Sequence, residues 1–518
     1  MLGKLPKKTV LVNEDNQVVA DQVDTVYINN EPVDCWVLWK KIDNIRTIPT
    51  GSDSPIALAH HLVERQIYDY TGIGYFSRLL AHVCHVCKDL GHHGISEIPR
   101  IFRKCGLIIR SIIFTTLNII MAFGLVSISR IIEPCFRIRV GPIYVHRFGH
   151  LGFELAYAIG EKEHSGKRNT TFYWPRTNAT WANSQLEIMA HRSLKIRPWF
   201  RLADKMHRRL PGGHRFCRIP PSEAPADYNW SGMCDVEGYI SRGDPKFKLT
   251  TAEIDSGSEQ LAQFGLSAKD KFVCYSIYTS ANINYYRTEF PRNPDISNLA
   301  WSYSAMSYRE VSMDAFHKSI FYLIDQGYKV VRLGKNETHP LNIEHENLID
   351  YASSGYASDF LDVWLLAHCS FLVTSGTGVV HIADGFQVPI VRVNSDRPGV
   401  QHKWSRQIFV PKPLLHKATG KALCLSEQLQ HDYSVTAEYE AHGLIHADRK
   451  PDEILAPIAE MHQRLNDTWK GTQDDHTRQE KYWEIWQSWD RFSSLSGWIC
   501  PDFSIGAQFL RDHEWYLQ

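Results

Sequence analysis

A short run of small and hydroxyl-bearing residues in the second half of the chain has the pattern of an anion-binding loop. The run is Thr374, Ser375, Gly376, Thr377 and Gly378. It follows an apolar stretch over 371–373 that predicts a buried strand, and it precedes a predicted helix over 379–386. In this order the free N–H groups of the first helical turn point to one spot, where the helix dipole also favours negative charge. The glycines allow close backbone approach and the hydroxyls can add hydrogen bonds, so we predict a diphosphate site here.

Five further residues are candidates for the same site. They are Arg287, Arg292, Arg332, Gly334 and His381. The first two lie in a long stretch without a predicted element, 281–308, and loops of that length are usually functional. A guanidinium suits phosphate because it can donate two parallel hydrogen bonds. The alternative for the whole pattern is a tight strand–helix turn that caps its own helix, because a single glycine loop is a weak signal.

A second strand–glycine–helix pattern occurs earlier in the chain. Residues 143–145 predict a strand, Arg147 to His150 a turn, and 152–159 a helix. His150 in this turn is a candidate general base, because an imidazole takes up a proton near neutral pH. Glu154, one helical turn further on, is the rival base. A helix-capping or packed histidine is the alternative for His150.

Predicted strands and helices alternate along most of the chain, which is typical of α/β folds. We interpret 136–268 and 269–465 as two Rossmann-like domains. In the second, the order of elements predicts a doubly wound parallel sheet, with the glycine loop at a strand's carboxyl end, where such sheets bind ligands. The stretch 219–270 is rich in Pro, Gly and Ser and is predicted to connect the two domains. Residues 466–518 are predicted to form a helical tail.

Residues 1–100 are predicted to form an extension of short strands and helices. Strand patterns occur over 9–40, and a helix is predicted from Ser54 to Tyr70. Cys84 and Cys87 form one CxxC pair with histidines nearby, but a second ligand pair at zinc-finger spacing is missing. We therefore predict no metal site.

Residues 101–135 contain a run of 19 residues without a charge, 111–129. As a helix this run would be about 28 Å long, enough to cross the core of a bilayer. Polar residues interrupt the run and basic residues flank both ends, which fits a helix that lies in one leaflet better than a helix that crosses. A spanning helix and a buried helix of a soluble protein remain as alternatives. We predict a membrane-associating helix.

Composition restricts the partners and the compartment. The chain has 57 basic and 57 acidic residues, so its overall charge does not favour nucleic acid as a partner. Its 11 cysteines are odd in number and scattered, and no secretory signal opens the sequence. We therefore expect reduced thiols in the cytoplasm.

Several blocks of sequence resemble a family of bacterial glycosyltransferases of the GT-B type. The blocks are RFGHL, YYRTEFPRNPDI, GYKVVRLGK, the run from Ile349 through the glycine loop to Asn394, PDEILAPIAEMHQRL and FSIGAQFLRDH. Together they span roughly Arg137 to the C-terminus and leave residues 1–100 outside. A more distant resemblance is to the ADP-heptose:lipopolysaccharide heptosyltransferases, which have a Ser/Asp-x-Thr-Gly-x-x-His loop. This chain differs by having Gly376 where an Asp is common and His150 where those enzymes have a carboxylate, which argues against heptose as the sugar.

The resemblance implies the GT-B arrangement, with the acceptor domain first and the nucleotide-sugar domain second. It implies transfer of a sugar from a nucleotide-sugar donor to a cell-surface glycan or glycolipid, at the cytoplasmic face of the bacterial inner membrane. No cofactor or divalent metal is expected, because fixed cations and a helix N-terminus can stabilise the departing diphosphate. A sugar-nucleotide epimerase of related fold and a non-catalytic glycan-binding or assembly protein remain as alternatives.

Overall fold

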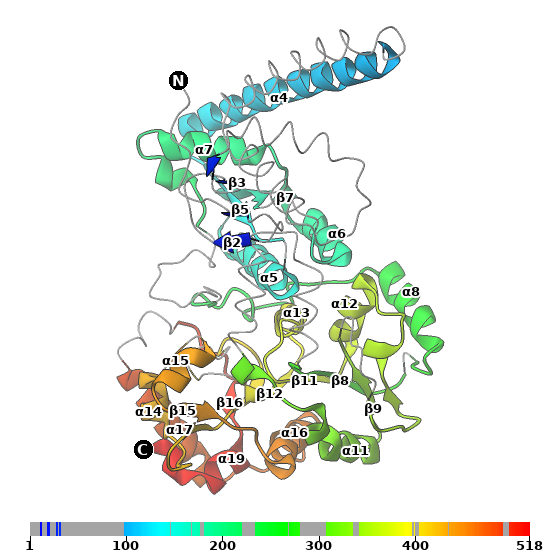
Figure 1. Cartoon of the computed structure of the whole chain (residues 1–518), viewed down its shortest axis with the longest axis vertical. Helices are drawn as coiled ribbons and strands as arrows, with labels where there is room; N and C mark the ends of the chain where they lie inside the picture. The colour runs from blue at the N-terminus through cyan, green and yellow to red at the C-terminus, as the bar shows by residue number, and fades with distance from the viewer. Residues whose placement is uncertain are drawn as a thin grey trace. The chain divides into compact units, whose positions relative to one another are not determined.

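The computed structural model describes four short N-terminal strands and then most of the chain from residue 98 onward. The later ranges are 98–145, 147–166, 168–176, 181–219, 234–267, 269–279, 307–334, 341–395, 398, 403–431, 433, 435–489 and 497–518. The chain divides into two compact units, one of residues 1–116 with 283–304 and one of residues 117–282 with 305–518. Figure 1 shows the described helices and strands, coloured along the chain. The predictions for Arg287, Arg292, the helix from Ser54 and the Cys84–Cys87 pair fall outside the described residues.

The first unit contains a small sheet in the range where short strands are predicted. Its strands are β1 (Leu11–Val12), β2 (Val18–Ala20), β3 (Tyr27–Ile28) and β4 (Glu31–Pro32). They pair in the order β2-β1-β3-β4, and only the β1–β3 pair is parallel.

The hydrophobic segment is one helix, α4 (Ile98–Ile132), close to the predicted range 101–135. Within the described part of the chain it is the one helix long and apolar enough to cross a membrane, over Ile113–Ile132. By length and composition alone this is weak support for a crossing.

A parallel three-stranded sheet follows α4. Its strands β5 (Arg137–Ile143), β6 (Asn169–Pro175) and β7 (Lys195–Ile196) pair in chain order. The helices that accompany them are α5 (Phe148–His164), α6 (Ser184–Ser193) and α7 (Phe200–Arg209). The predicted strand at 143–145 is shifted: β5 ends at Ile143, and α5 begins at Phe148, inside the predicted turn. Arg147, not a capping side chain, is the extended residue that precedes the helix.

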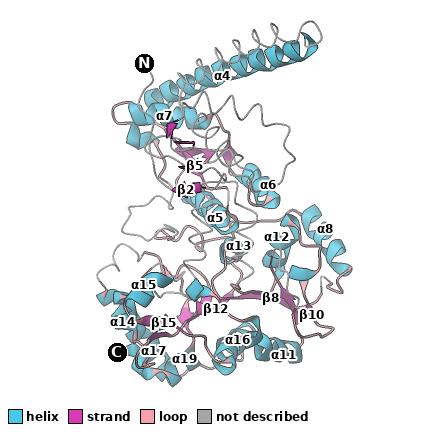
Figure 2. Cartoon of the chain, viewed as in Figure 1, coloured by secondary structure: helices cyan, strands magenta, loops and turns pink. Residues whose placement is uncertain are grey.

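The largest element is a seven-stranded sheet in which every pair is parallel (Figure 2). Its strands are β8 (Phe272–Ser276), β9 (Lys329–Arg332), β10 (Leu348–Ile349), β11 (Phe371–Thr374), β12 (Ile390–Ser395), β13 (Gln407–Pro411) and β16 (Ser504–Ile505). They lie in the order β10-β9-β8-β11-β12-β13-β16. Numbered along the chain, the first six strands have the order 3-2-1-4-5-6 of a Rossmann sheet. The predicted doubly wound parallel sheet is therefore present.

Helices connect and cover these strands. They are α8 (Thr251–Ala262), α11 (His317–Asp325), α12 (Asp359–His368), α13 (Val380–Phe386), α14 (Leu425–Gln430), α15 (Thr436–Ala441), α16 (Pro451–Leu465), α17 (Gln473–Ser488) and α19 (Ala507–Asp512). Two short strands, β14 (Leu414–His416) and β15 (Leu444–His446), pair antiparallel beside them. Helix α8 corrects the interpretation of 219–270 as a plain connection: Thr250 and Glu253 form a capping box at its start.

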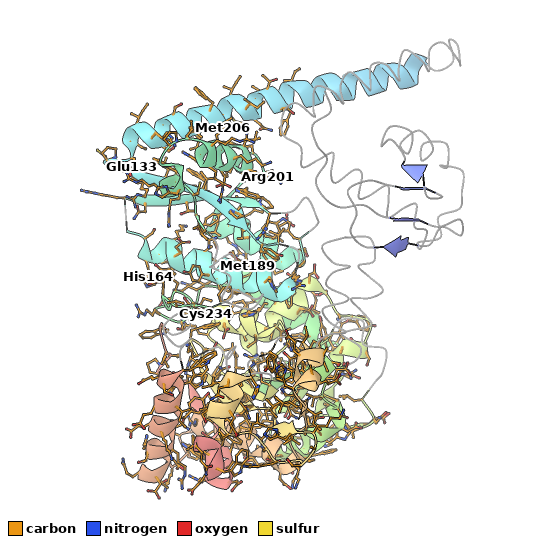
Figure 3. All side chains as sticks on the ribbon, turned by 60° about the vertical axis from the view of Figure 1, so that its left-hand side comes forward. Glu133, His164, Met189, Arg201, Met206 and Cys234 are labelled. Atoms are coloured by element: carbon orange, nitrogen blue, oxygen red, sulfur yellow. The ribbon has the colours of Figure 1, made fainter. Side chains whose placement is uncertain are left out.

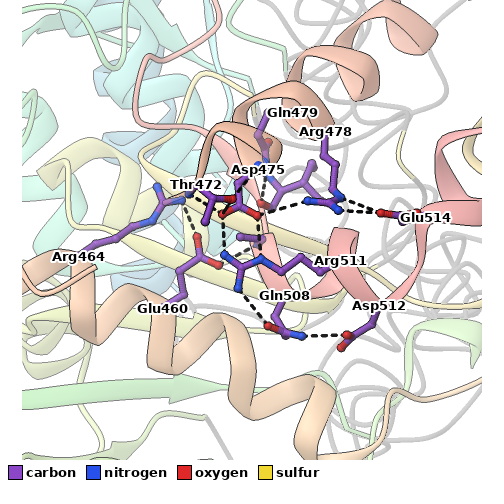
Figure 4. Close-up of polar contacts among 12 residues, drawn as sticks. Glu460, Arg464, Thr472, Asp475, Arg478, Gln479, Gln508, Arg511, Asp512 and Glu514 are labelled. Carbon is purple, nitrogen blue, oxygen red and sulfur yellow. Dashed lines mark hydrogen bonds and ion pairs between the residues drawn. The ribbon is translucent and has the colours of Figure 1, made fainter. Parts of the chain in front are cut away.

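The C-terminal segment is more than a helical tail, because β16 extends the sheet next to β13. Helix α17 is held to α19 by charge: the Arg511 guanidinium donates to both carboxylate oxygens of Asp475, and Thr472 caps the helix on the same carboxylate (Figure 4). A two-residue strand is too short for a sequence pattern to reveal, which explains the missed element.

One hydrophobic core joins the three-stranded part to the seven-stranded sheet within the second unit. Leu151, Phe153 and Leu155 of α5 lie in the same buried cluster as Ile382 of α13 and Phe272 of β8. The predicted boundary between the two Rossmann-like domains lies at 268/269, and residues on both sides of it belong to this one core.

Candidate functional site

The glycine loop lies where a Rossmann sheet changes direction. It follows β11, and β11 is the parallel neighbour of β8, the first strand of the sheet. From these two central strands the chain winds outward in opposite directions. Ligands bind in such sheets at the carboxyl ends of the strands at this switch point.

The hydroxyl groups of the loop form hydrogen bonds within the protein. The hydroxyl of Thr374 accepts from the N–H groups of Gly376 and Thr377, at 3.1 and 3.2 Å. The hydroxyls of Thr377 and Ser276 are 2.8 Å apart, and Ser375 Oγ accepts from the N–H of Tyr278 at 2.8 Å. These hydrogen bonds fix the loop to the end of β8, and a hydrogen bond from the hydroxyls to an anion stays a prediction.

The donors that face outward are therefore the next two backbone groups. None of the described residues accepts a hydrogen bond from the N–H of Gly378 or Val379. Gly378 is exposed and Val379 is half-buried. A rigid loop that presents two unused N–H groups is suited to bind an oxyanion.

Gly376 is required by its conformation and by its neighbours. Its φ is +100°, a backbone conformation that residues with a Cβ adopt only at a cost in conformational energy. A Cβ there would lie 3.1 Å from Nη2 of Arg392 and 3.3 Å from Oγ of Ser395. The guanidinium of Arg392 is thus in contact range of the loop and is buried, with 3% of the side chain exposed.

A second guanidinium, that of Arg309, contacts Gly376. Arg309 donates from Nη2 to the carbonyl oxygen of Gly376 and stacks over the ring of Tyr278, 5.0 Å from the ring centre. Within the described part of the chain, the structure brings Arg309 and Arg392 to the loop, and neither is among the predicted residues. A lone arginine inside the apolar stretch PIVRVN was a usable signal for Arg392, whereas nothing in the sequence marks Arg309.

The two glycine patterns meet in the structure. A Cβ on Gly149 would lie 2.7 Å from the Cα and 2.9 Å from the oxygen of Gly378. One turn further, a Cβ on Gly152 would lie 2.6 Å from Cδ1 of Ile382. The first turn of α5 therefore packs directly against the loop and α13, so Gly378 allows the approach of α5 as well as of any ligand.

His150 belongs to this contact, as the residue after Gly149 in the first turn of α5. It is half-buried, its ring lies 5.4 Å from the ring of Tyr144, and Nη1 of Arg147 is 3.5 Å from its Nε2. Because a guanidinium can only donate, Nε2 is the accepting nitrogen in this pair. The sequence predicted His150 in a turn; it lies instead in a helical turn beside the glycine loop.

Glu154, one helical turn after His150, is directed into the core. Its carboxylate is completely buried, and Oε2 is 3.5 Å from Nη1 of Arg218, which is itself buried and bonded to Glu161 at 2.7 Å. A buried ion pair of this kind holds the core of the three-stranded part. We therefore assign Glu154 a structural role and retain His150 as the candidate base.

His381 is packed against α5 and paired with an acid. Its ring meets the ring of Phe153 edge-on at 5.3 Å, and its Nδ1 is 3.8 Å from Oδ2 of Asp384. Burial raises the pKa of Asp384 to about 6, although His381, Ser405 and Arg392 counteract the shift. His381 and Asp384 thus form a buried pair under the loop.

Arg332 is not at the loop but in a separate ion pair. Its guanidinium binds both oxygens of Asp350, at 2.7 and 3.1 Å, and Asp350 also accepts from the N–H of Leu341. Gly334 follows β9 two residues later. Arg332 and Asp350 therefore pair with each other, and a role of Arg332 in donor binding stays a prediction.

Asp359, the first residue of α12, binds α6. Its Oδ2 accepts from the N–H of Ser184 at 2.8 Å, and its backbone oxygen accepts from the side chain of Asn183. The neighbouring Ser358 caps α12, because its hydroxyl accepts from the N–H of Leu361. Among the described residues no group of three His, Cys, Asp or Glu side chains could hold a metal ion.

Comparison with known proteins gives matches in structure only. No protein-family model and no curated protein matches the sequence. A family 9 glycosyltransferase from Veillonella parvula matches 54% of this chain and 86% of its own, at 11% identity and a TM-score of 0.33. ADP-heptose lipopolysaccharide heptosyltransferase II from E. coli matches 49% and 84%, at 16% identity and a TM-score of 0.30.

A third similar structure is the iron-containing heptosyltransferase TibC in complex with ADP-D-β-D-heptose. It matches 63% of this chain and 77% of its own, at 12% identity and a TM-score of 0.25. All three are glycosyltransferases, the class that the sequence resemblance names. Because every TM-score is below 0.5, we base function on the topology and contacts of the chain itself.

Proposed function

We propose that the chain is a glycosyltransferase that moves a sugar from a nucleotide-sugar donor to a hydroxyl acceptor. The observation that supports this best is the position of the glycine loop at the β8/β11 switch point, with Arg309 and Arg392 at Gly376. A loop in this position with two guanidinium groups suits a nucleoside diphosphate.

In this proposal the donor's diphosphate binds at the N–H groups of Gly378 and Val379. Arg309 and Arg392, which lie at Gly376, stabilise the charge that develops on the diphosphate as the glycosidic bond breaks. Fixed guanidinium groups can perform this task without a divalent metal, so we propose a metal-independent reaction. Arg287 and Arg292 remain predicted donor ligands.

His150 is proposed as the general base. It lies in the helical turn that packs against the loop, so an acceptor hydroxyl held there would be close to the sugar's reacting carbon. Nε2 accepts from Arg147 in the structure and can accept a proton from the acceptor once that long contact opens.

The acceptor is proposed to be a glycan or glycolipid, reached at the cytoplasmic face of the bacterial inner membrane. The sequence resemblance motivates this part, and α4 gives the chain an apolar helix that suits a membrane surface.

The test is a thermal-shift screen of the purified chain against nucleotide sugars, followed by product analysis of the best donor with membrane lipids. The proposal expects stabilisation by one nucleotide sugar and its free diphosphate, and transfer of the labelled sugar to a lipid or glycan. Interconversion of the free nucleotide sugar without transfer would assign the chain to the epimerases instead. Binding with neither reaction would make it a non-catalytic glycan-binding protein.

A further inference from the structure

In helix α4 the small and polar residues face the protein and the large apolar residues face outward. This is the reverse of a surface helix in a water-soluble protein. The described side chains that face the protein are small or polar: Ala122 and Ser129 are completely buried, and Val126 is 4% exposed. Thr115 and Asn118 continue this row toward the N-terminus at helical spacing and are half-buried.

The row is packed against the three-stranded part of the chain. Ala122 and Val126 share a buried cluster with Phe200 and Ala203 of α7 and Val140 of β5. Ser129 Oγ lies 3.2 Å from Nε2 of His207, and Arg130 donates to the carbonyl oxygen of Pro211 at 3.0 Å. Figure 3 shows Arg201 and Met206 of α7 beside the helix. Contact therefore extends along the C-terminal half of α4.

The opposite face is formed by large apolar side chains. They are Ile113, Phe114, Leu117, Ile120, Met121, Phe123, Ile128 and Ile131, each between 43% and 76% exposed. Ile113, Leu117, Ile120 and Ile131 recur at spacings that place them on one side of the helix. A water-exposed helix would have charges on this face, and in the range 113–131 the one charged residue, Arg130, is on the flank and bonded to Pro211.

Basic residues outnumber acidic ones near the end of α4, where Glu133 lies within ion-pair distance of Arg137 and Arg215. Between residues 195 and 215 the chain has seven basic residues: Lys195, Arg197, Arg201, Lys205, Arg208, Arg209 and Arg215. Asp204, the one acid in that range, is buried and paired with Arg208. Arg209 is exposed beside Leu210, a large apolar residue with 42% of its surface exposed, in the turn that also contacts Arg130.

We propose that α4 lies flat in one leaflet of an anionic membrane, with its apolar face in the acyl chains and the basic residues around α7 at the lipid headgroups. The positive charge of α7 favours a lipid surface over a second copy of the protein as the partner that covers the apolar face of α4. Anionic headgroups attract a polybasic segment that lies next to an apolar helix inserted in the membrane. This inference is independent of the proposed reaction.

Packing of α4 on α7 also favours a flat helix over a spanning one. A helix that crosses the bilayer has lipid around it at mid-depth, whereas the buried row from Ala122 to Ser129 is covered by a part of the protein with a polar, basic surface. Those basic groups would then have to enter the acyl region, which is unfavourable.

The test is flotation of the full chain with preformed vesicles at low salt. The wild-type chain is expected to float with vesicles that contain phosphatidylglycerol, to bind phosphatidylcholine vesicles more weakly, and to be released from the anionic vesicles in part by salt. Ile120→Glu should reduce flotation at least tenfold, whereas Phe321→Glu, the same change at an exposed apolar residue of α11, should leave it unchanged. Arg209→Gln should weaken binding to anionic vesicles about fivefold, and Lys269→Gln should not.

Three results would overturn the proposal. One is equal flotation of the wild type and Ile120→Glu. Another is a wild-type dimer in solution, measured by light scattering without lipid, that Ile120→Glu converts to a monomer, because a second copy would then cover the face. The third is protection of an N-terminal epitope tag from protease added outside the vesicles, since a flat helix leaves both ends on the same side. An accessible tag supports the flat arrangement.

Discussion

The backbones of Gly149 and Gly378 pack against each other, so closely that a Cβ on the first would lie 2.7 Å from the Cα of the second. One glycine begins α5 and the other ends the loop after β11. Through this contact the candidate base, His150, and the candidate diphosphate loop belong to one rigid cluster. Each part of this arrangement can be tested separately.

Gly149→Ala should separate the two elements. The added methyl meets backbone atoms, which cannot rotate away, so α5 must shift at a cost of about 1–3 kcal/mol in the free energy of unfolding. Urea unfolding measures this cost. Gly471→Ala is the matched control, because the nearest atom to its Cβ is 3.5 Å away. Equal unfolding midpoints for the two variants would contradict the contact.

Gly376→Ala should weaken binding of a nucleoside diphosphate at least tenfold, measured by titration calorimetry. The new side chain would press on the Arg392 guanidinium and would strain the loop at φ +100°. Gly420→Ala provides the control: its φ is +69°, and nothing lies within 4 Å of its Cβ. Both substitutions impose backbone strain of about 1–2 kcal/mol, but Gly420→Ala should keep the wild-type affinity. Matching losses of affinity would mean that strain alone is being measured.

Arg309→Gln and Arg332→Gln should differ in what they impair. Loss of the Arg309 cation removes charge-assisted hydrogen bonds to the diphosphate, worth about 2–3 kcal/mol, or roughly 30- to 150-fold in Kd. Loss of Arg332 leaves Asp350 without its partner and should lower the melting temperature with little change in Kd. A large loss of affinity in Arg332→Gln with an unchanged melting temperature would instead indicate that Arg332 binds the donor.

His150→Ala should lower the rate of sugar transfer by about 10²–10⁴-fold, the usual effect of removing a positioned base, with donor affinity nearly unchanged. Glu154→Gln should mainly destabilise the fold, by about 1–3 kcal/mol, because Arg218 keeps Glu161 as a partner. Transfer per folded molecule should stay near that of the wild type. Full activity of the His150→Ala chain would show that α5 does not supply the general base through His150.

Asp384→Asn should change how stability depends on pH. Burial raises the pKa of Asp384 from 3.8 to about 6, so the folded chain holds a proton that the unfolded chain has released. Stability from this group is therefore present below pH 4 and is lost as the pH rises to about 6. The asparagine variant should melt at a higher temperature than the wild type at pH 7.5, by an amount equivalent to about 1–3 kcal/mol, and at the same temperature at pH 4. A variant less stable at pH 7.5 would show that the ionised carboxylate is needed by His381 or Arg392.

The sheet and its loop could be predicted from sequence because both follow local rules. Apolar runs bounded by glycine and polar residues mark β8, β9, β11 and β12, and their order along the chain predicts a doubly wound sheet. Short elements such as β16 give no periodic pattern, and α8 lies in a stretch whose Pro, Gly and Ser content obscures its capping box.

The site was predicted less completely because its contacts join distant parts of the chain. The loop itself was found, but its hydroxyls turned inward to Ser276 and Tyr278, about 100 residues earlier. Arg309 reaches Gly376 across 67 positions, and Gly149 reaches Gly378 over more than 200. No local pattern encodes such pairings, and none indicates that Arg332, at the end of β9, pairs with Asp350.

The most direct test of the donor site is a crystal structure of the chain with a bound nucleoside diphosphate. We predict a phosphate within hydrogen-bond distance of the N–H groups of Gly378 and Val379, with the guanidinium of Arg309 or Arg392 on the same diphosphate. A diphosphate bound at any other place, with the loop after β11 empty, would contradict the proposed function.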